Sequence, residues 1–152
     1  MITIGSILWP MLKSSDFRTG RHVVFSLNVH LVFVTKYRRD VITAKAFDIL
    51  HDSWEKVCQK FECKLQEVNY EIDHVHLLVT YPPKVSLSAL VNSLKGVSAR
   101  RLRQVNLPEV QSKLWGYQFW SPSYCAVSCG GAPLEVIKQY IQQQEGGASP
   151  PP

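Results

Sequence analysis

The sequence predicts an α+β domain in which an antiparallel sheet of four strands carries two helices on one face. Three observations lead to this prediction. Segments with alternating apolar residues, typical of strands, occur four times along the chain. Two other segments have apolar residues every three or four positions, which is typical of helices. Together the segments follow the order β-α-β-β-α-β along the chain. The length of 152 residues suits a single domain with one core.

The first predicted strand runs from His22 to Tyr37, where side chains alternate between two faces. Its apolar face carries Phe25, Leu27, Val29, Leu31 and Phe33, and its polar face carries Ser26, Asn28 and His30. A helix is predicted next, from about Thr43 to Phe61, with Thr43 as its N-cap. Its apolar stripe consists of Ala46, Phe47, Leu50, Trp54, Val57, Cys58 and Phe61.

The middle of the chain predicts two strands joined by a tight turn and then a second helix. The strands cover residues 63–70 and 74–81, and Pro82 ends the second because proline cannot donate to the ladder. The helix covers residues 86–105. Its apolar stripe consists of Leu87, Leu90, Val91, Leu94 and Val97.

The last strand is predicted over residues 117–128, with Pro122 inside it. Gly130 and Gly131 then form a joint, and Pro133 opens a final helix that runs to about Gln144. The complete order is the ferredoxin-like (RRM-like) arrangement with one additional C-terminal helix. In this arrangement the first and third strands are the central neighbours.

Composition indicates a soluble globular protein whose basic charge has two interpretations: a polyanionic partner, or a basic surface that is merely solvated. Its 17 Lys and Arg against 12 Asp and Glu give a net charge of +5, which favours nucleic acid. No apolar stretch approaches the ~20 residues that span a bilayer. The four cysteines lack zinc-knuckle spacing, and without a secretory signal we expect reduced thiols in the cytoplasm. We expect a flexible extension over residues 1–15, a folded domain over 16–145 and a disordered tail over 146–152.

The segment DHVHLLV places two histidines in an otherwise apolar strand. Residues two apart in a strand point the same way, so His74 and His76 share a face and could clasp one divalent cation. His30 and Asn28 lie on the polar face of the first strand and could approach them. The alternative is that both histidines are satisfied side chains on a half-exposed sheet.

The final helix reads PLEVIKQYIQQQ and places Ile137, Tyr140, Ile141 and Gln144 on roughly one side. Tyr140 lies at the edge of the apolar stripe, which allows two interpretations. It is either a core residue or a phenol nucleophile with a metal ligand one turn away. A phenol has a pKa of about 10, so attack at neutral pH requires a cation or basic neighbours.

DHVHLLV followed far downstream by YIQQQ resembles the HUH endonucleases, named for histidine–hydrophobe–histidine. The chain is more closely similar to the single-tyrosine transposases of the smallest bacterial and archaeal insertion sequences, including their repeat-associated relatives. The resemblance covers roughly residues 20–144. The segments that carry it are GRHVVFSLNVHLVFVTKYR, DHVHLLVTYPP, LVNSLKGVSARRLR, KLWGYQFWSPSY and GGAPLEVIKQYI.

This resemblance implies a function and a site. His74, His76 and Gln144 would hold Mg²⁺ or Mn²⁺, and Tyr140 would attack DNA to give a 5′-phosphotyrosine. The family acts as homodimers on single-stranded DNA next to hairpins. Two alternatives stay open: a non-mobile repeat-associated nuclease, and a binding module for single-stranded nucleic acid without catalysis. A replication initiator or relaxase is disfavoured, since such proteins are normally larger.

Basic and aromatic residues are the candidates for DNA contacts. We expect phosphate contacts from Lys36, Arg38, Arg39, Lys95, Arg100, Arg101 and Arg103. Trp115, Tyr117, Phe119 and Trp120 include candidates for stacking on unpaired bases, although core packing is the favoured role for most of them.

Overall fold

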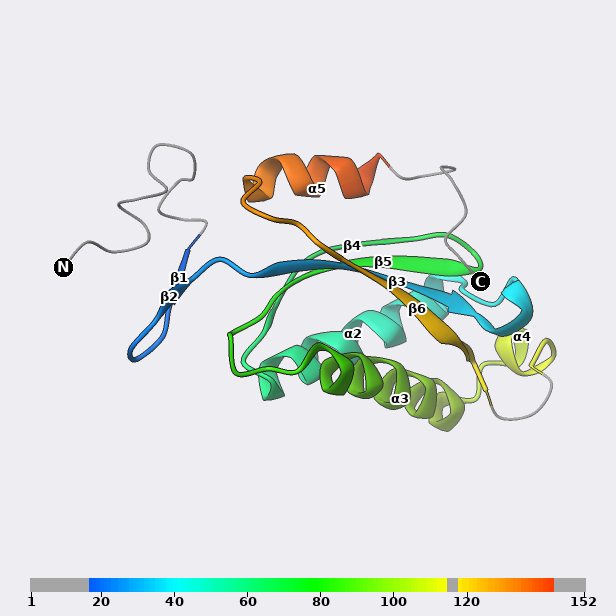
Figure 1. Ribbon diagram of the computed structural model, residues 1–152. Helices are drawn as coiled ribbons and strands as arrows, with labels where there is room; N and C mark the ends of the chain where they lie inside the picture. The colour runs from blue at the N-terminus through cyan, green and yellow to red at the C-terminus, as the bar shows by residue number, and fades with distance from the viewer. Residues whose placement is uncertain (1–16, 115–117, 144–152) are drawn as a thin grey trace.

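A computed structural model describes residues 17–114 and 118–143 of the chain. Its centre is an antiparallel sheet with the strand order β4-β5-β3-β6 (Figure 1). The strands are β3 (Asn28–Thr35), β4 (Lys64–Tyr70), β5 (His74–Thr80) and β6 (Trp120–Ser128). The first and third strands of the predicted order, β3 and β5, are the central neighbours, so the predicted topology is confirmed.

Helices cover both faces of this sheet (Figure 1). The two long helices, α2 (Ala44–Lys60) and α3 (Leu87–Val105), lie together on one face. The last helix, α5 (Leu134–Gln142), lies across the opposite face, where it contacts β4 and β5. Two single-turn elements, η2 (Lys36–Arg38) and α4 (Pro108–Gln111), complete the helical structure of the described residues. The described residues therefore form three layers, in which α5 is the helix on the side of the sheet opposite to α2 and α3.

The main core lies between the sheet and the α2–α3 layer. The inward positions of β3 and β5 alternate along each strand, as predicted: they are Val29, Leu31 and Phe33, and Val75, Leu77 and Val79. Two buried indoles find hydrogen-bond partners. Trp54 donates to the Leu94 carbonyl at 3.2 Å, and Trp120 donates to the Ser98 hydroxyl at 3.1 Å. Both indole N–H groups in this apolar core therefore have a hydrogen-bond acceptor.

Short polar side chains set the helix starts. The Thr43 hydroxyl accepts from the amide of Ala46 at 3.2 Å, which confirms it as the N-cap of α2. Ser86 caps α3 through the amide of Ala89 at 3.3 Å. Pro133 precedes α5 as its N-cap residue, so that helix begins one position later than predicted.

The single long first strand predicted over residues 22–37 is wrong. The chain forms β2 (Val24–Phe25), which pairs with β1 (Arg18–Thr19) in a separate two-stranded hairpin, and only then enters β3. The alternation of apolar residues continues through both strands although their partners differ. Pairing partners are a tertiary property, so a local pattern did not reveal the break.

Three further expectations concern the chain as a whole. The four cysteines, Cys58, Cys63, Cys125 and Cys129, are free thiols in this structure. No helix among residues 17–114 and 118–143 is long and apolar enough to span a bilayer. The predicted extension, residues 1–15, and the predicted tail, residues 146–152, lie outside the described part of the chain.

Candidate active site

Two imidazoles share the face of β5 that lies under α5. His74 and His76 are 8% and 4% exposed, and their ring centroids are 5.2 Å apart. Their neighbours Val75 and Leu77 point into the main core on the other face. The period-two prediction is therefore correct about the shared face, but the two histidines are buried rather than half-exposed.

A third imidazole comes from β3. The His30 Nε2 and the His76 Nδ1 lie 3.0 Å apart and share a hydrogen bond, and the two rings are stacked at 5.1 Å. His76 pairs with Val32 in the ladder, so His30 is its diagonal neighbour. Asn28 does not join this group, because its side-chain oxygen accepts from Thr80 near the other end of β5.

A carboxylate orients the first histidine of the pair. His74 Nδ1 donates to Asp73 Oδ1 at 2.7 Å, and Arg38 Nε donates to Asp73 Oδ2 at 3.1 Å. Burial alone would raise the pKa of Asp73, but the hydrogen bonds and charges of His74 and Arg38 lower it below its ordinary value. The carboxylate thus orients the His74 ring and favours the tautomer whose Nδ1 carries the proton, so that Nε2 is the nitrogen available to a ligand.

Burial keeps the other two imidazoles uncharged. It lowers the pKa of His76 to about 4, with the neighbouring His30 and His74 acting in the same direction. Burial also lowers the pKa of His30. Both side chains are therefore neutral at pH 7, which is the form that coordinates metal ions.

The His74–His76 pair fits a divalent cation. Each ring uses Nδ1 in a hydrogen bond, so Nε2 is the nitrogen left on both. Two imidazoles with nitrogens about 2.1 Å from one ion have ring centres no more than roughly 6.5 Å apart, a condition that the observed separation meets. Among the described residues, no three His, Cys, Asp or Glu side chains gather to hold a metal. The predicted third ligand, Gln144, lies outside the described residues.

Helix α5 is held on the sheet by a small apolar contact and by two polar ones. Ile137 and Ile141 pack on Leu78 of β5. The Asn69 amide donates to the Ile141 carbonyl at 3.2 Å, and Gln142 donates to Glu67 at 3.3 Å. These contacts set the rotation of α5 about its axis.

Tyr140 is placed beside the imidazoles by this rotation. Its ring meets the His30 ring edge-on, with centroids 6.4 Å apart. Its side chain is not part of the core, since it is 56% exposed. The interpretation of Tyr140 as a core residue is therefore excluded, and an accessible phenol lies next to the histidine cluster.

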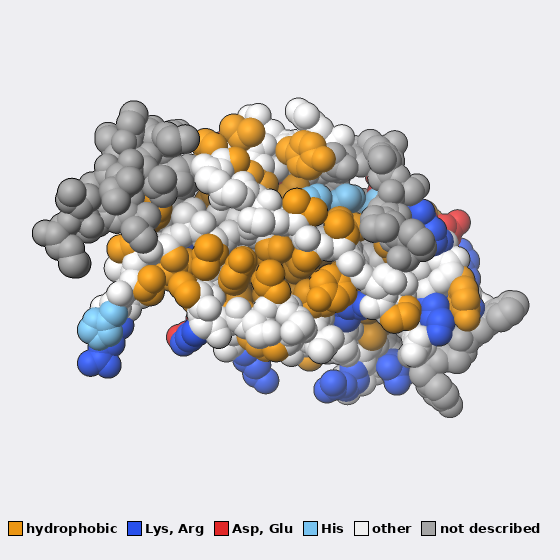
Figure 2. All heavy atoms as spheres, in the orientation of Figure 1, with side chains coloured by type: hydrophobic (Ala, Val, Ile, Leu, Met, Phe, Trp, Pro, Cys, Tyr) orange, Lys and Arg blue, Asp and Glu red, His pale blue; other side chains and the backbone are white. Residues whose placement is uncertain are grey.

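The predicted basic residues fall into two groups on different layers. Lys36, Arg38 and Arg39 lie at the η2 turn, next to Asp73. Lys95, Arg100, Arg101 and Arg103 lie on α3, across the sheet from the histidines, and basic side chains gather along this side in Figure 2. Lys95 donates to the Ser121 carbonyl at 2.6 Å, so it also anchors β6.

Two of the four candidate aromatic residues pack in the main core, which is the role that the sequence favoured for most of them. Phe119 and Trp120 are 3% and 6% exposed and belong to the main core, so the stacking interpretation is wrong for both. Trp115 and Tyr117 lie outside the described residues. Besides Tyr140, Tyr37 is an exposed aromatic side chain near the site, with 74% of its surface exposed. Its position inside the basic run KYRR was the available signal.

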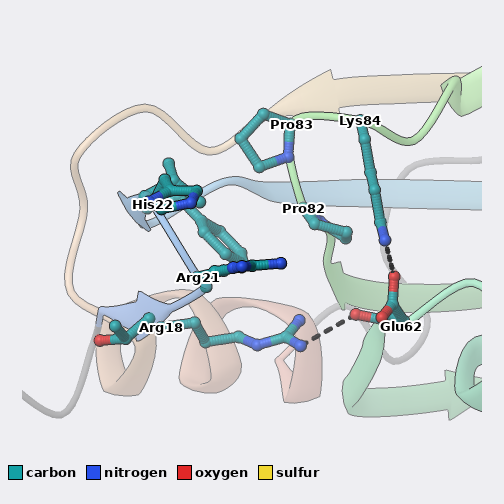
Figure 3. A pocket seen from close by; sticks show the side chains of 11 residues that line it. Arg18, Arg21, His22, Glu62, Pro82, Pro83 and Lys84 are labelled. Carbon is teal, nitrogen blue, oxygen red and sulfur yellow. Dashed lines mark hydrogen bonds and ion pairs between the residues drawn. The ribbon is translucent and has the colours of Figure 1, made fainter.

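A cavity of about 500 Å³ lies at the other end of the sheet, against the β1–β2 hairpin (Figure 3). Its lining includes Arg18, Glu62 and Lys84. Glu62 forms an ion pair with Lys84, and its carbonyl accepts from Arg18 at 2.9 Å. None of the clustered histidines and no tyrosine lines this cavity, so it is separate from the site under α5.

Residues 23–144 match the family described as IS200-like transposases. The chain belongs to this family. The ISDra2 transposase TnpA of Deinococcus radiodurans is 33% identical over 129 residues, which cover 85% of this chain and 91% of the relative. The transposase of insertion sequence IS200 from Salmonella typhimurium is 28% identical over 85% of this chain and 84% of its own length. The predicted family membership is confirmed, and the protein is a DNA transposase.

Solved structures agree with the fold of this transposase. A crystal structure of a transposase from Deinococcus radiodurans R1 superposes with a TM-score of 0.67 at 31% identity, covering 87% of this chain and 99% of that one. A REP-associated tyrosine transposase bound to a REP hairpin gives 0.55 at 12% identity, covering 82% and 67%. The second likeness shows the shared α+β fold alone.

Proposed function

We propose that this transposase cleaves and rejoins single-stranded DNA next to hairpins through a 5′-phosphotyrosine on Tyr140. One observation carries the proposal: the accessible Tyr140 ring lies beside His30, which is hydrogen-bonded to His76 of the pair. The proposed nucleophile and the proposed cation-binding pair therefore lie on the same side of the sheet, each in contact with His30. A protein of the same fold was solved with a REP hairpin, which supports a hairpin as the substrate.

In the proposed reaction, the Tyr140 oxygen attacks the scissile phosphorus and loses its proton to solvent. The new bond joins phosphorus to the phenol oxygen, and the bond from phosphorus to the 3′ oxygen breaks. The departing oxygen takes up a proton and becomes a free 3′-hydroxyl. Because the phosphotyrosine keeps the energy of the phosphodiester, a different 3′-hydroxyl can reverse the step and join a new strand without ATP.

His74, His76 and Gln144 are the proposed ligands of Mg²⁺ or Mn²⁺. A bound divalent cation would supply Lewis acidity and orient the scissile phosphate. Asp73 keeps the His74 imidazole in the coordinating tautomer through the 2.7 Å hydrogen bond. The low pKa of His76 keeps protons from competing for its ring at neutral pH.

The proposal also covers the oligomeric state, the bounds of the catalytic domain and the residues that contact DNA phosphates. Each chain offers one Tyr140, and joining two DNA ends requires two such tyrosines, so we propose a homodimer. The proposed catalytic domain covers residues 16–145. The proposed phosphate contacts are Lys36, Arg38, Arg39, Lys95, Arg100, Arg101 and Arg103.

Replacing Tyr140 by Phe tests the nucleophile, since it removes one oxygen and keeps the ring that meets His30. We expect labelled hairpin-bearing single-stranded DNA with Mn²⁺ to form a covalent adduct with the unaltered protein. The adduct should fall by roughly a thousandfold or more in Tyr140→Phe on a denaturing gel. Binding, measured by fluorescence anisotropy, should be retained.

The matched control is Tyr124→Phe, which removes the hydroxyl of another exposed tyrosine, on β6. It should form the adduct as the unaltered protein does. An undiminished adduct in Tyr140→Phe would remove Tyr140 from the role and with it the proposed reaction.

A further inference from the structure

The η2 turn contains two consecutive residues in a left-handed conformation. Tyr37 has φ of 59° and Arg38 has φ of 53°, although neither is glycine. A side chain with a Cβ is disfavoured in this region, so such residues persist only where the surroundings hold them. Residues in such conformations cluster at functional sites, so the side chains that the η2 turn exposes are candidates for a function.

Hydrogen bonds to two distant segments, and one within the turn, hold the turn. The Thr35 amide donates to the Asp73 carbonyl at 3.0 Å, and the Thr35 hydroxyl donates to the Arg39 carbonyl at 2.8 Å. The Lys36 amide donates to the Phe119 carbonyl at 2.9 Å. The backbone before and after Tyr37 is therefore tied to the sheet end and to the chain that enters β6.

The η2 turn exposes the Tyr37 ring to solvent. At 74% exposure, it is the most exposed large apolar or aromatic side chain of the described residues, so it contributes little to the core. The Lys36 ammonium lies 5.4 Å from the ring centroid, and the Arg39 guanidinium lies 5.0 Å from it. An exposed aromatic face bordered by cations is the combination that binds unpaired nucleotides, since the ring stacks on a base and the cations meet the phosphates.

The turn is also connected to the candidate active site. Arg38, next to Tyr37, donates to Asp73, and Asp73 accepts from His74. The ring is therefore displayed at the end of β5 where the histidine pair begins. A strand with its scissile phosphate at that pair would bring a flanking base within reach of Tyr37.

We propose that Tyr37 is a stacking platform for an unpaired base that flanks the scissile phosphate. This inference rests on the proposed function, because it takes single-stranded DNA as the ligand. The ring holds the flanking nucleotide, and Lys36 and Arg39 contact its phosphates. The platform positions the strand and takes no part in bond breakage.

The test measures stacking directly, in the Tyr140→Phe background so that bound DNA stays intact. The probe is a hairpin with about ten unpaired nucleotides on each side and 2-aminopurine at each unpaired position in turn, since stacking quenches its fluorescence. Tyr37→Phe keeps the ring. Tyr37→Asn removes the ring but keeps a residue that tolerates the left-handed conformation. Tyr124→Asn makes the same replacement on β6.

We expect a quench at one or two adjacent positions beside the hairpin with the parent protein, Tyr37→Phe and Tyr124→Asn. Tyr37→Asn should lose that quench and bind the probe about tenfold more weakly, the effect of one lost base stack. Its thermal unfolding midpoint should match that of Tyr37→Phe, which separates lost binding from lost folding.

A quench or an affinity that survives in Tyr37→Asn would overturn the platform. If the chain with Tyr140 intact still forms the covalent adduct, the proposed function stands without it. Absence of both probe binding and adduct in the unaltered protein would instead overturn the proposed function together with the platform.

Discussion

Asp73 connects a proposed metal ligand to a basic residue, because its two oxygens accept from His74 and from Arg38. Asp73→Asn keeps the shape of the side chain but removes the charge that fixes the His74 tautomer. We expect its affinity for Mn²⁺ at pH 7, measured by isothermal titration calorimetry, to fall about 10- to 100-fold. Asp48→Asn, an exposed position on α2, should bind as before. Equal affinities in the two variants would contradict the orienting role.

For individual residues, the sequence predicted the shared face of the histidine pair but not the side chains that surround the pair. The period of two was enough to place His74 and His76 on one face. The contact with His30 depends on the register between β3 and β5, which places Val32 opposite His76. The exposure of Tyr37 depends on a left-handed turn held by distant backbone, and local propensity gives no sign of it.

Of the three longer helices, α5 buries the fewest residues against the rest of the fold. Its buried cluster consists of Leu78, Ile137 and Ile141, whereas α2 and α3 share the extensive core on the other face. We expect the amides of α5 to exchange with deuterium well before those of α2 and α3, as opening α5 exposes little apolar surface. Native-state exchange followed by mass spectrometry measures this order. Simultaneous exchange of all three helices would show that α5 opens only with the whole domain.

Element boundaries were predictable where local chemistry decides them. Thr43 and Ser86 mark helix starts because their hydroxyls accept amide hydrogens that the helix itself leaves unpaired. The break between β2 and β3 was not predictable, because it reflects a change of pairing partner. The face on which α5 lies was also undetermined, since an amphipathic pattern predicts a buried stripe without naming its partner.

For the whole molecule, the charge distribution predicts the response to salt. The net charge is +5, and the proposed phosphate contacts lie both at the η2 turn and on α3. If four phosphates are neutralised, a fourfold rise in salt weakens binding of single-stranded DNA roughly 50-fold. Anisotropy titrations with Tyr140→Phe between 50 and 200 mM salt measure this change. An affinity that does not vary over this range would exclude phosphate contacts as the main source of binding.

The central strands contribute to both sides of the sheet, and this restricts how the chain can vary. In β3 and β5 every second residue packs into the core, and the residues between them face α5 and include the imidazoles. Inserting or deleting one residue within either strand would exchange these roles, turning valines towards α5 and histidines into the apolar interior. Length changes inherited by relatives should therefore fall in the connections, while the two central strands keep their residue count.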